Sequence, residues 1–285
     1  MQFGFIGVGL MGGPVCRNLI RGGKSVLVYD LSKDAVERTL AVGSTGKAAA
    51  ALEDMASCDV LFTSLPLPQH VMGIMCGNKG LYKIMKKGAI HVELSTIDPT
   101  TAATLAEEGL QSGVAYIQCT LGKTPAQCEK GEEPMFIGGN QDAIKKLEDV
   151  FKIIGIPNYV GTADAACAVE LISNMIGMSN LVILAEGLRL GEKSGMDLNQ
   201  LLTLLSDTGA RSFQMDVRGP WIAQGDFANR FGLDLALKDV RLGCEMARAW
   251  GLDLTGIESA LAVYKEASAS GYGQEDCNAV FKVIK

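Results

Sequence analysis

The chain has 285 residues, of which 48% are hydrophobic and 20% are charged, and its formal net charge is -6 at neutral pH. This length predicts two domains, and the composition leaves little room for a long disordered tail. The absence of a basic stretch argues against nucleic acid as a partner. The absence of about 18 uninterrupted apolar residues argues against a membrane span.

The N-terminus and the cysteines favour a cytoplasmic protein. Residues 1–6 lack the basic start of a signal peptide and lead directly into a glycine loop. The eight cysteines form no CxxC pair, which is typical of reduced core residues. With only two histidines, His70 and His91, the composition argues against a zinc site, so we expect no metal.

The first thirty residues predict one strand–loop–helix–strand unit. Phe3–Ile6 is an apolar strand, and a glycine loop follows it at once. Residues 14–21 have helical periodicity, and residues 25–29 form a valine-rich strand with Asp30 at its carboxyl end.

Strands and helices continue to alternate further along the chain. The pattern predicts helices over residues 48–56 and 99–109, and strands over residues 60–64, 89–94, 115–119 and 135–138. This alternation indicates an α/β Rossmann domain with a doubly wound, mainly parallel sheet, in which ligands bind at the carboxyl ends of the strands.

The second half has a different pattern. Residues 165–194 contain no proline and predict one long helix, and only helical segments follow it: residues 199–206, 218–224, 233–250 and 256–268. We therefore expect a dinucleotide-binding domain over residues 1–162, a connecting helix over 163–194 and an all-α domain over 195–285. Ninety residues are few for an independent domain, so packing against a second subunit, as a homodimer or higher homo-oligomer, is expected.

The loop Gly7-Val8-Gly9-Leu10-Met11-Gly12 carries the cofactor prediction. Gly7 permits a tight turn, Gly9 lets the backbone approach a pyrophosphate, and Gly12 allows close packing of helix on strand. Amides at the helix N-terminus then meet the phosphates. Asp30 would accept hydrogen bonds from the ribose hydroxyls and repel a 2'-phosphate, which favours NAD(H), although Lys33 leaves NADP(H) possible.

Several further segments carry a family resemblance that extends over almost the whole chain. The start Gly4–Pro14, the pairs Leu65-Pro66 and Ser95-Thr96, the run Cys119–Ala126 and the C-terminal stretches Leu237–Asp239 and Gly271–Asp276 resemble the β-hydroxyacid dehydrogenases. This group includes 3-hydroxyisobutyrate dehydrogenase and tartronate semialdehyde reductase. The resemblance implies a Rossmann domain, a long connecting helix and a helical, dimerising domain like that of 6-phosphogluconate dehydrogenase.

The resemblance also implies roles for individual residues. Leu65, Pro66 and Thr96 would line the path of the cofactor, and Lys238 would lie near the nicotinamide, unless it is a solvated helix lysine. Gly122, Lys123 and Thr124 stand where the family's substrate loop usually reads Ser-Gly-Gly. Phe213 matches a segment that reaches the substrate pocket in relatives, with plain core as the alternative. His70 is expected in a loop and is assigned no role.

The family carries a catalytic lysine early in the long helix, with an asparagine four residues later. Here Asn174 is present, but the lysine position holds Glu170. The spacing puts both residues on one helix face. Four interpretations stay open: Glu170 is partly buried with a raised pKa and moves the proton itself; Lys123 supplies the missing cation; the substrate is cationic; or the chemistry is lost and Glu170 is solvated.

The sequence therefore predicts an NAD(H)-dependent oxidoreductase that moves a hydride between nicotinamide and a small hydroxy acid or semialdehyde held between the two domains. Glu170 and Asn174 are its candidate catalytic residues. An imine reductase or amine dehydrogenase of the same family is one alternative. A dinucleotide-binding protein without catalysis is the other.

Overall fold

The computed structural model of the chain describes residues 1–285, which divide into two compact units, Met1–Glu170 and Leu171–Lys285. The chain passes from one unit to the other within a single helix, α8 (Ala163–Lys193). The predicted α/β first half and helical second half are both confirmed.

The first unit is built on an eight-stranded sheet with the order β3-β2-β1-β4-β5-β6-β7-β8. All neighbouring strands are parallel except β6 and β7, which pair antiparallel. In this doubly wound order, β1 and β4 are neighbours, and the connections that follow them run to opposite sides of the sheet, which leaves a crevice at the carboxyl ends of these two strands. The strands are β1 (Phe3–Ile6), β2 (Val26–Tyr29), β3 (Gly46–Ala48), β4 (Val60–Thr63), β5 (Ile90–Glu93), β6 (Ala115–Leu121), β7 (Pro134–Gly139) and β8 (Ile156–Gly161).

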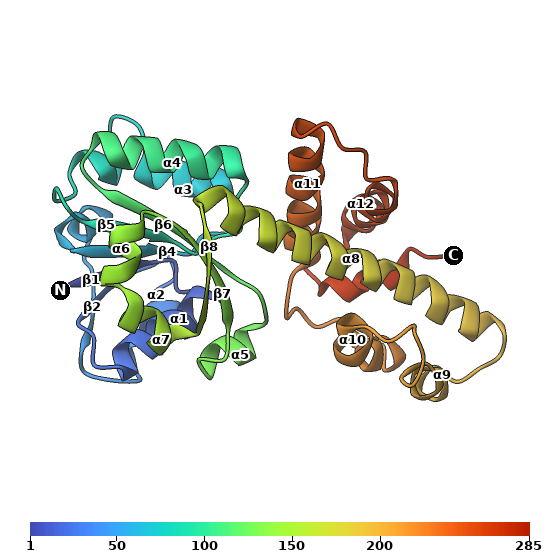
Figure 1. Ribbon diagram of the computed structural model, residues 1–285. Helices are drawn as coiled ribbons and strands as arrows, with labels where there is room; N and C mark the ends of the chain where they lie inside the picture. Colours follow the sequence, from blue (N-terminus) through green and yellow to red (C-terminus); the bar gives the residue numbers. More distant parts are fainter. The chain divides into compact units, whose positions relative to one another are not determined.

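Helices cover both faces of this sheet (Figure 1). Because successive side chains of a strand point to opposite faces, Phe3 and Phe5 of β1 join one apolar cluster, while Ile6 joins the other. The first cluster packs under α1 (Gly12–Arg21), α2 (Lys33–Leu40), α6 (Gln141–Lys146) and α7 (Glu148–Ile154); the second packs under α3 (Pro68–Met75) and α4 (Pro99–Gln111). A short helix, α5 (Pro125–Glu129), follows β6.

Two expectations for this unit are wrong. Residues 48–56 do not form an α-helix, because β3 ends at Ala48 and only a 3-10 helix, η1 (Leu52–Ser57), follows. The side chain of Asp54 accepts from the backbone of Ala50 and Ala51, which fixes the turn that starts this short helix. His70 lies in helix α3 rather than in a loop.

The second unit is helical throughout and has one apolar cluster of its own. The last two-thirds of α8 contribute Leu181, Ala185 and Leu188 to it. The other helices are α9 (Leu198–Leu205), α10 (Phe213–Ala223), α11 (Leu233–Ala249) and α12 (Thr255–Ala267), followed by the short helices η3 (Ser268–Tyr272) and η4 (Cys277–Lys282).

The first unit also contains a short helix, η2 (Leu81–Lys83), which precedes β5.

Helix α8 is long and apolar enough, by length and composition alone, to cross a membrane. It has 31 residues, and its most apolar window has a mean hydropathy of 1.6, with 39% of that window buried. Core helices of globular proteins pass the same test, so this helix by itself is weak evidence for a membrane span.

Candidate functional site

The glycine loop joins β1 to α1 with a geometry that only glycine allows. Gly7 has a φ of +87°, and a Cβ there would lie 2.2 Å from the Ser64 carbonyl oxygen. A Cβ on Gly12 would lie 2.1 Å from the Gly7 carbonyl oxygen, so α1 can start this close to the strand only at glycine. At Gly9, in contrast, a Cβ would meet nothing within 4 Å, so the backbone there is open to an incoming group.

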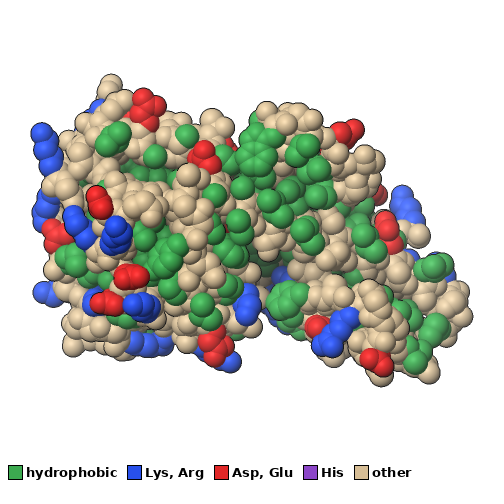
Figure 2. All heavy atoms as spheres, viewed as in Figure 1, with side chains coloured by type: hydrophobic (Ala, Val, Ile, Leu, Met, Phe, Trp, Pro, Cys, Tyr) green, Lys and Arg blue, Asp and Glu red, His purple; other side chains and the backbone are tan.

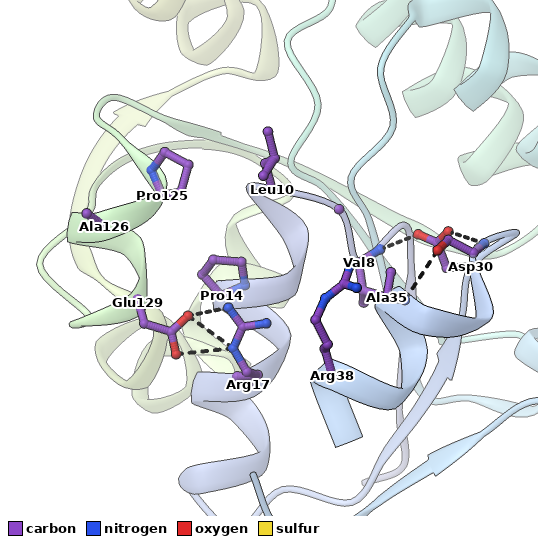
Figure 3. A pocket seen from close by; sticks show the side chains of 12 residues that line it. Val8, Leu10, Pro14, Arg17, Asp30, Ala35, Arg38, Pro125, Ala126 and Glu129 are labelled. Atoms are coloured by element: carbon purple, nitrogen blue, oxygen red, sulfur yellow. Dashed lines mark hydrogen bonds and ion pairs between the residues drawn. The ribbon is translucent and has the colours of Figure 1, made fainter. Parts of the chain in front are cut away.

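The carboxylate of Asp30 fastens this loop to the end of β2. Its Oδ2 accepts from the Val8 amide at 2.7 Å, and its Oδ1 accepts from the Ser32 amide at 2.8 Å (Figure 3). Asp30 is half-buried, so the carboxylate still reaches the surface of the pocket.

A cavity of about 530 Å³ opens beside the loop, within the range of small-molecule sites. Residues of the glycine loop and of α1, α2 and α5 line it. Arg38 of α2, which belongs to no sequence motif of the predicted site, extends along the wall near Val8 and Asp30 (Figure 3). On the opposite wall Arg17 donates through Nε to both carboxylate oxygens of Glu129, at 3.1 and 3.0 Å. The lining of the cavity is therefore positive at Arg38 and neutralised at Arg17. Leu10 also lines the cavity and is exposed, and Met11 beside it is half-buried.

The turns after β4 and β5 are bonded to each other. The Leu65 amide donates to the Ser95 hydroxyl at 2.7 Å, and Pro66 next to Leu65 is exposed. Thr96 follows Ser95, and its hydroxyl donates to Glu170 Oε1 at 2.6 Å. Glu170 is only 4% exposed, so the interpretation of Glu170 as a solvated residue is wrong.

The predicted substrate segment leaves the sheet at the end of β6. Gly122 and Thr124 are half-buried, and the side chain of Lys123 is exposed. Beneath them lies Glu133, which is not among the predicted site residues. Glu133 is fully buried, and its Oε1 accepts from the Lys123 amide at 2.5 Å. Burial raises the pKa of the Glu133 carboxyl to about 7.

In the helical unit, Asn174 and Lys238 meet at a common partner. Asp239 accepts from Asn174 Nδ2 at 3.1 Å and forms an ion pair with the Lys238 ammonium at 3.0 Å. Both members of the pair are buried, so the interpretation of Lys238 as a solvated lysine is wrong. Burial raises the pKa of Asp239, and the neighbouring Lys238 opposes that shift. Phe213, at the start of α10, is 51% exposed, so the plain-core alternative for it is wrong.

The structure thus brings Thr96 together with Glu170 in the first unit, and Asn174 with Lys238 in the second. Glu133 and Asp239 are absent from the predicted set. The sequence did indicate Asp239, because it directly follows Lys238, a predicted site residue with which an acidic side chain can form an ion pair. For Glu133 no motif exists, because only the folded chain brings it under residue 123.

Two family models together match nearly the whole chain. The NAD binding domain of 6-phosphogluconate dehydrogenase matches residues 2–168. The family described as NAD-binding of NADP-dependent 3-hydroxyisobutyrate dehydrogenase matches residues 165–284.

Relatives and solved structures are similar over their full lengths. The 2-(hydroxymethyl)glutarate dehydrogenase of Eubacterium barkeri is 30% identical, covering 99% of this chain and 94% of that protein. The crystal structure of 3-hydroxyisobutyrate dehydrogenase from Salmonella typhimurium superposes with a TM-score of 0.91 at 25% identity, covering 99% of both chains. An imine reductase from Myxococcus stipitatus, covering 100% of both chains, has a TM-score of 0.67 at 15% identity, which shows a shared fold alone.

Proposed function

Because this chain belongs to the β-hydroxyacid dehydrogenase family, we propose that it is an NAD(P)-dependent oxidoreductase acting on a CH–OH group. It would transfer a hydride between the nicotinamide and a small hydroxy acid or its semialdehyde. The observation that carries the proposal is the cavity beside the glycine loop, whose backbone and Asp30 carboxylate match the groups of a dinucleotide.

The residues present fit the dinucleotide on three counts. Gly9 leaves open space where a pyrophosphate would approach the backbone, α1 begins immediately behind it, and Asp30 offers a carboxylate to ribose hydroxyls. Leu10, Met11, Leu65, Pro66 and Thr96 would line the rest of its path, with Lys238 near the nicotinamide. When bound, the cofactor supplies the hydride chemistry.

The choice between NAD(H) and NADP(H) depends on two side chains of opposite charge. Asp30 would repel a 2'-phosphate, whereas Arg38, on the same wall of the cavity, would attract one. Because the Asp30 carboxylate lies at the end of β2, where the ribose would meet it, we propose that NAD(H) is preferred and that Arg38 allows NADP(H) to bind more weakly.

On the substrate side we propose that Glu170 moves or tunes the proton. Its burial and its bond from the Thr96 hydroxyl hold the carboxyl group in a fixed position, as a group that gives or takes a substrate proton requires. Gly122, Lys123, Thr124, Asn174 and Phe213 would orient the substrate.

A second candidate is reduction of a cyclic imine or oxidation of an amine. The observation that favours it is the same buried carboxylate, because an acid in place of the family's lysine attracts a cationic substrate nitrogen. This candidate and the first require different substrates, so one assay separates them.

The test is oxidation of NADH and of NADPH by the purified protein, followed at 340 nm, against small aldehydes, 3-oxo acids and cyclic imines. We expect turnover of an aldehyde or oxo acid that falls by about 10²–10⁴-fold in Glu170→Gln. Glu186→Gln is the matched control, because Glu186 is an exposed glutamate on the same helix. Turnover of imines alone would establish the second candidate, and cofactor binding without any turnover would contradict both.

We also propose that the protein is a homo-oligomer whose subunits pack along α8. Hydrophobic side chains gather over this helix in Figure 2. Along α8 itself, four hydrophobic side chains that are between 44% and 74% exposed recur at intervals of four and seven residues on one helix face: Ile172, Ile176, Ile183 and Leu190. Size-exclusion chromatography with light scattering should give the molar mass of a dimer or a larger oligomer. In Ile183→Glu the measured mass should shift towards that of the monomer. A monomer that binds lipid vesicles instead would identify the stripe as a membrane surface.

A further inference from the structure

A chain of buried polar side chains crosses the second apolar cluster of the Rossmann unit. The Tyr82 hydroxyl lies 2.6 Å from His91 Nδ1, His91 Nε2 lies 2.7 Å from the Thr63 hydroxyl, and that hydroxyl donates to Glu93 Oε2 at 2.6 Å. All four side chains are buried. Polar groups are costly in such a position unless each is hydrogen-bonded, so the chain must be continuous to be tolerated.

The number of protons in this chain fixes its direction. Thr63 has one hydroxyl proton, which it gives to Glu93, so the bond between Thr63 and His91 must be donated by the imidazole. Burial lowers the pKa of His91 to about 3, so the ring is neutral and carries a single proton, on Nε2. His91 Nδ1 then accepts from Tyr82, whose pKa burial raises well above its ordinary value. The contact of 3.7 Å between His91 and Glu93 is therefore not an ion pair.

The far end of the chain supports the two predicted cofactor turns. Glu93 Oε1 accepts from the Ser95 amide at 2.6 Å, and the Ser95 hydroxyl accepts from the Leu65 amide at 2.7 Å. Gln118 of β6 reinforces the same turn, because its Nε2 donates to the backbone oxygens of Glu93 and Ser95 at 3.3 and 3.1 Å. Glu93 is thus the one carboxylate that bonds both the buried chain and the turn that carries Thr96.

We propose that Glu93 is a positioning residue that holds the Leu65-Pro66 and Ser95-Thr96 turns in place for the cofactor, and that the buried chain behind it has two states of opposite hydrogen-bond direction. The proposal rests on the proposed function in one respect, the assignment of these two turns to cofactor binding.

The second state arises when Glu93 takes up a proton. A proton on Oε2 must be donated to Thr63, so Thr63 turns to donate to His91 Nε2, and the imidazole carries its single proton on Nδ1. Nδ1 then donates to the Tyr82 oxygen, and the Tyr82 hydroxyl turns its own proton away from the ring. Burial raises the pKa of Glu93 to about 7, which puts this reversal near neutral pH. The titratable groups that face it are Tyr82 from η2, His91 of its own strand, Tyr116 from β6 and Cys167 from α8. None of these is a cation at that pH. The hydrogen bonds from Ser95, Thr63 and Leu94 favour the carboxylate, but burial outweighs them in its effect on the Glu93 pKa.

The consequence for the turn is a weaker bond. A carboxylate accepts from the Ser95 amide about twice as strongly as a neutral carboxyl does. Protonation of Glu93 therefore loosens the turn, and we expect the affinity for NADH to fall by roughly three- to tenfold as the pH is lowered from 8.5 to 6.

The first experiment reads the direction of the chain directly from the imidazole nitrogens. The protein has two histidines, and the other, His70, is exposed and can be replaced in His70→Gln. With ¹⁵N-labelled histidine, NMR should show the His91 proton on Nε2 at pH 8.5 and on Nδ1 at pH 6. In Glu93→Gln the amide oxygen still accepts from Ser95 and the amide nitrogen must donate to Thr63, so the proton should stay on Nδ1 at every pH. A single tautomer in the wild type throughout, or a doubly protonated ring at pH 6, would overturn the proposal.

The second experiment measures the effect on the cofactor turns, by the fluorescence of bound NADH between pH 6 and 8.5. Glu93→Gln should bind with the weak affinity of the low-pH wild type and without pH dependence, whereas Glu107→Gln, an exposed glutamate of α4, should follow the wild type. If the wild type binds NADH with an affinity independent of pH and unchanged in Glu93→Gln, the positioning role is refuted. If the wild type fails to bind NADH and NADPH at all, the proposed function fails, while the tautomer measurement still decides the two-state chain.

Discussion

Neutralising Glu133 should remove a pH dependence from the stability of the Rossmann unit. The unfolded carboxyl titrates near its ordinary pKa of 4.5, and burial raises the pKa of the folded one to about 7. Between these values the folded protein holds a proton that the unfolded chain has lost, so rising pH favours unfolding. The contribution of Glu133 to the free energy of unfolding is therefore fully present below pH 4.5 and is lost as the pH rises through 7. One such carboxyl lowers the free energy of unfolding by about 2.5 kcal/mol between pH 5 and pH 8.

Glu133→Gln keeps an oxygen to accept from the Lys123 amide but cannot ionise. The difference between the free energies of unfolding of the wild type and of the variant should therefore decrease by about 2.5 kcal/mol from pH 5 to pH 8. The other titrating groups cancel in this difference. Both tryptophans, Trp221 and Trp250, lie in the helical unit, so urea unfolding should be followed by hydrogen exchange of peptides from β6 and β7. Glu132→Gln, the exposed neighbour, is the control. Parallel curves for wild type and Glu133→Gln would refute the reasoning.

Three further perturbations have outcomes set by single contacts. Asp276→Asn breaks the buried pair with Arg218, at 3.0 Å, and should cost about 3–5 kcal/mol in urea unfolding followed by tryptophan fluorescence; a cost below about 1 kcal/mol would contradict the pairing. Gly12→Ala puts a Cβ 2.1 Å from the Gly7 oxygen and should abolish the fluorescence of bound NADH, so wild-type affinity would count against the loop. Cys76 is the one cysteine that is not fully buried, so a thiol reagent should modify it first, and Cys76→Ser should lack that fast phase.

The longest element was predictable, whereas several short or exposed elements were not. The helix expected over residues 165–194 is observed as Ala163–Lys193. Strand β8 was missed because it is a mostly exposed edge strand that contains Pro157, so it lacks the apolar pattern of a core strand. Strand β3 has only three residues, too few to show any periodicity. Helix α2 was missed because only its start, capped by Ser32, and a narrow buried face distinguish it from a polar loop.

The candidate site shows the same division between local and distant determinants. The glycine loop and Asp30 lie within one strand–helix–strand unit, so their proximity in space can be predicted from one continuous stretch of sequence. The burial of Glu170 depends on Thr96, which is 74 positions away, and the position of Glu93 depends on Thr63, which is 30 positions away. Such contacts are created by the order of strands in the sheet, which no single segment encodes.

The clamp that Asp30 forms on the amides of Val8 and Ser32 has a kinetic consequence. Because the protein's own groups hold the loop, a nucleotide would dock on a preorganised surface and would not bear the entropy of ordering it. Encounter should then be limited by diffusion and orientation rather than by a slow rearrangement, with a single-exponential association whose rate rises linearly with nucleotide concentration. Replacing Asp30 by alanine would remove both an acceptor for the ribose and the clamp itself. The loss would therefore extend to the association rate, where a residue that served only as a ribose acceptor would change dissociation alone.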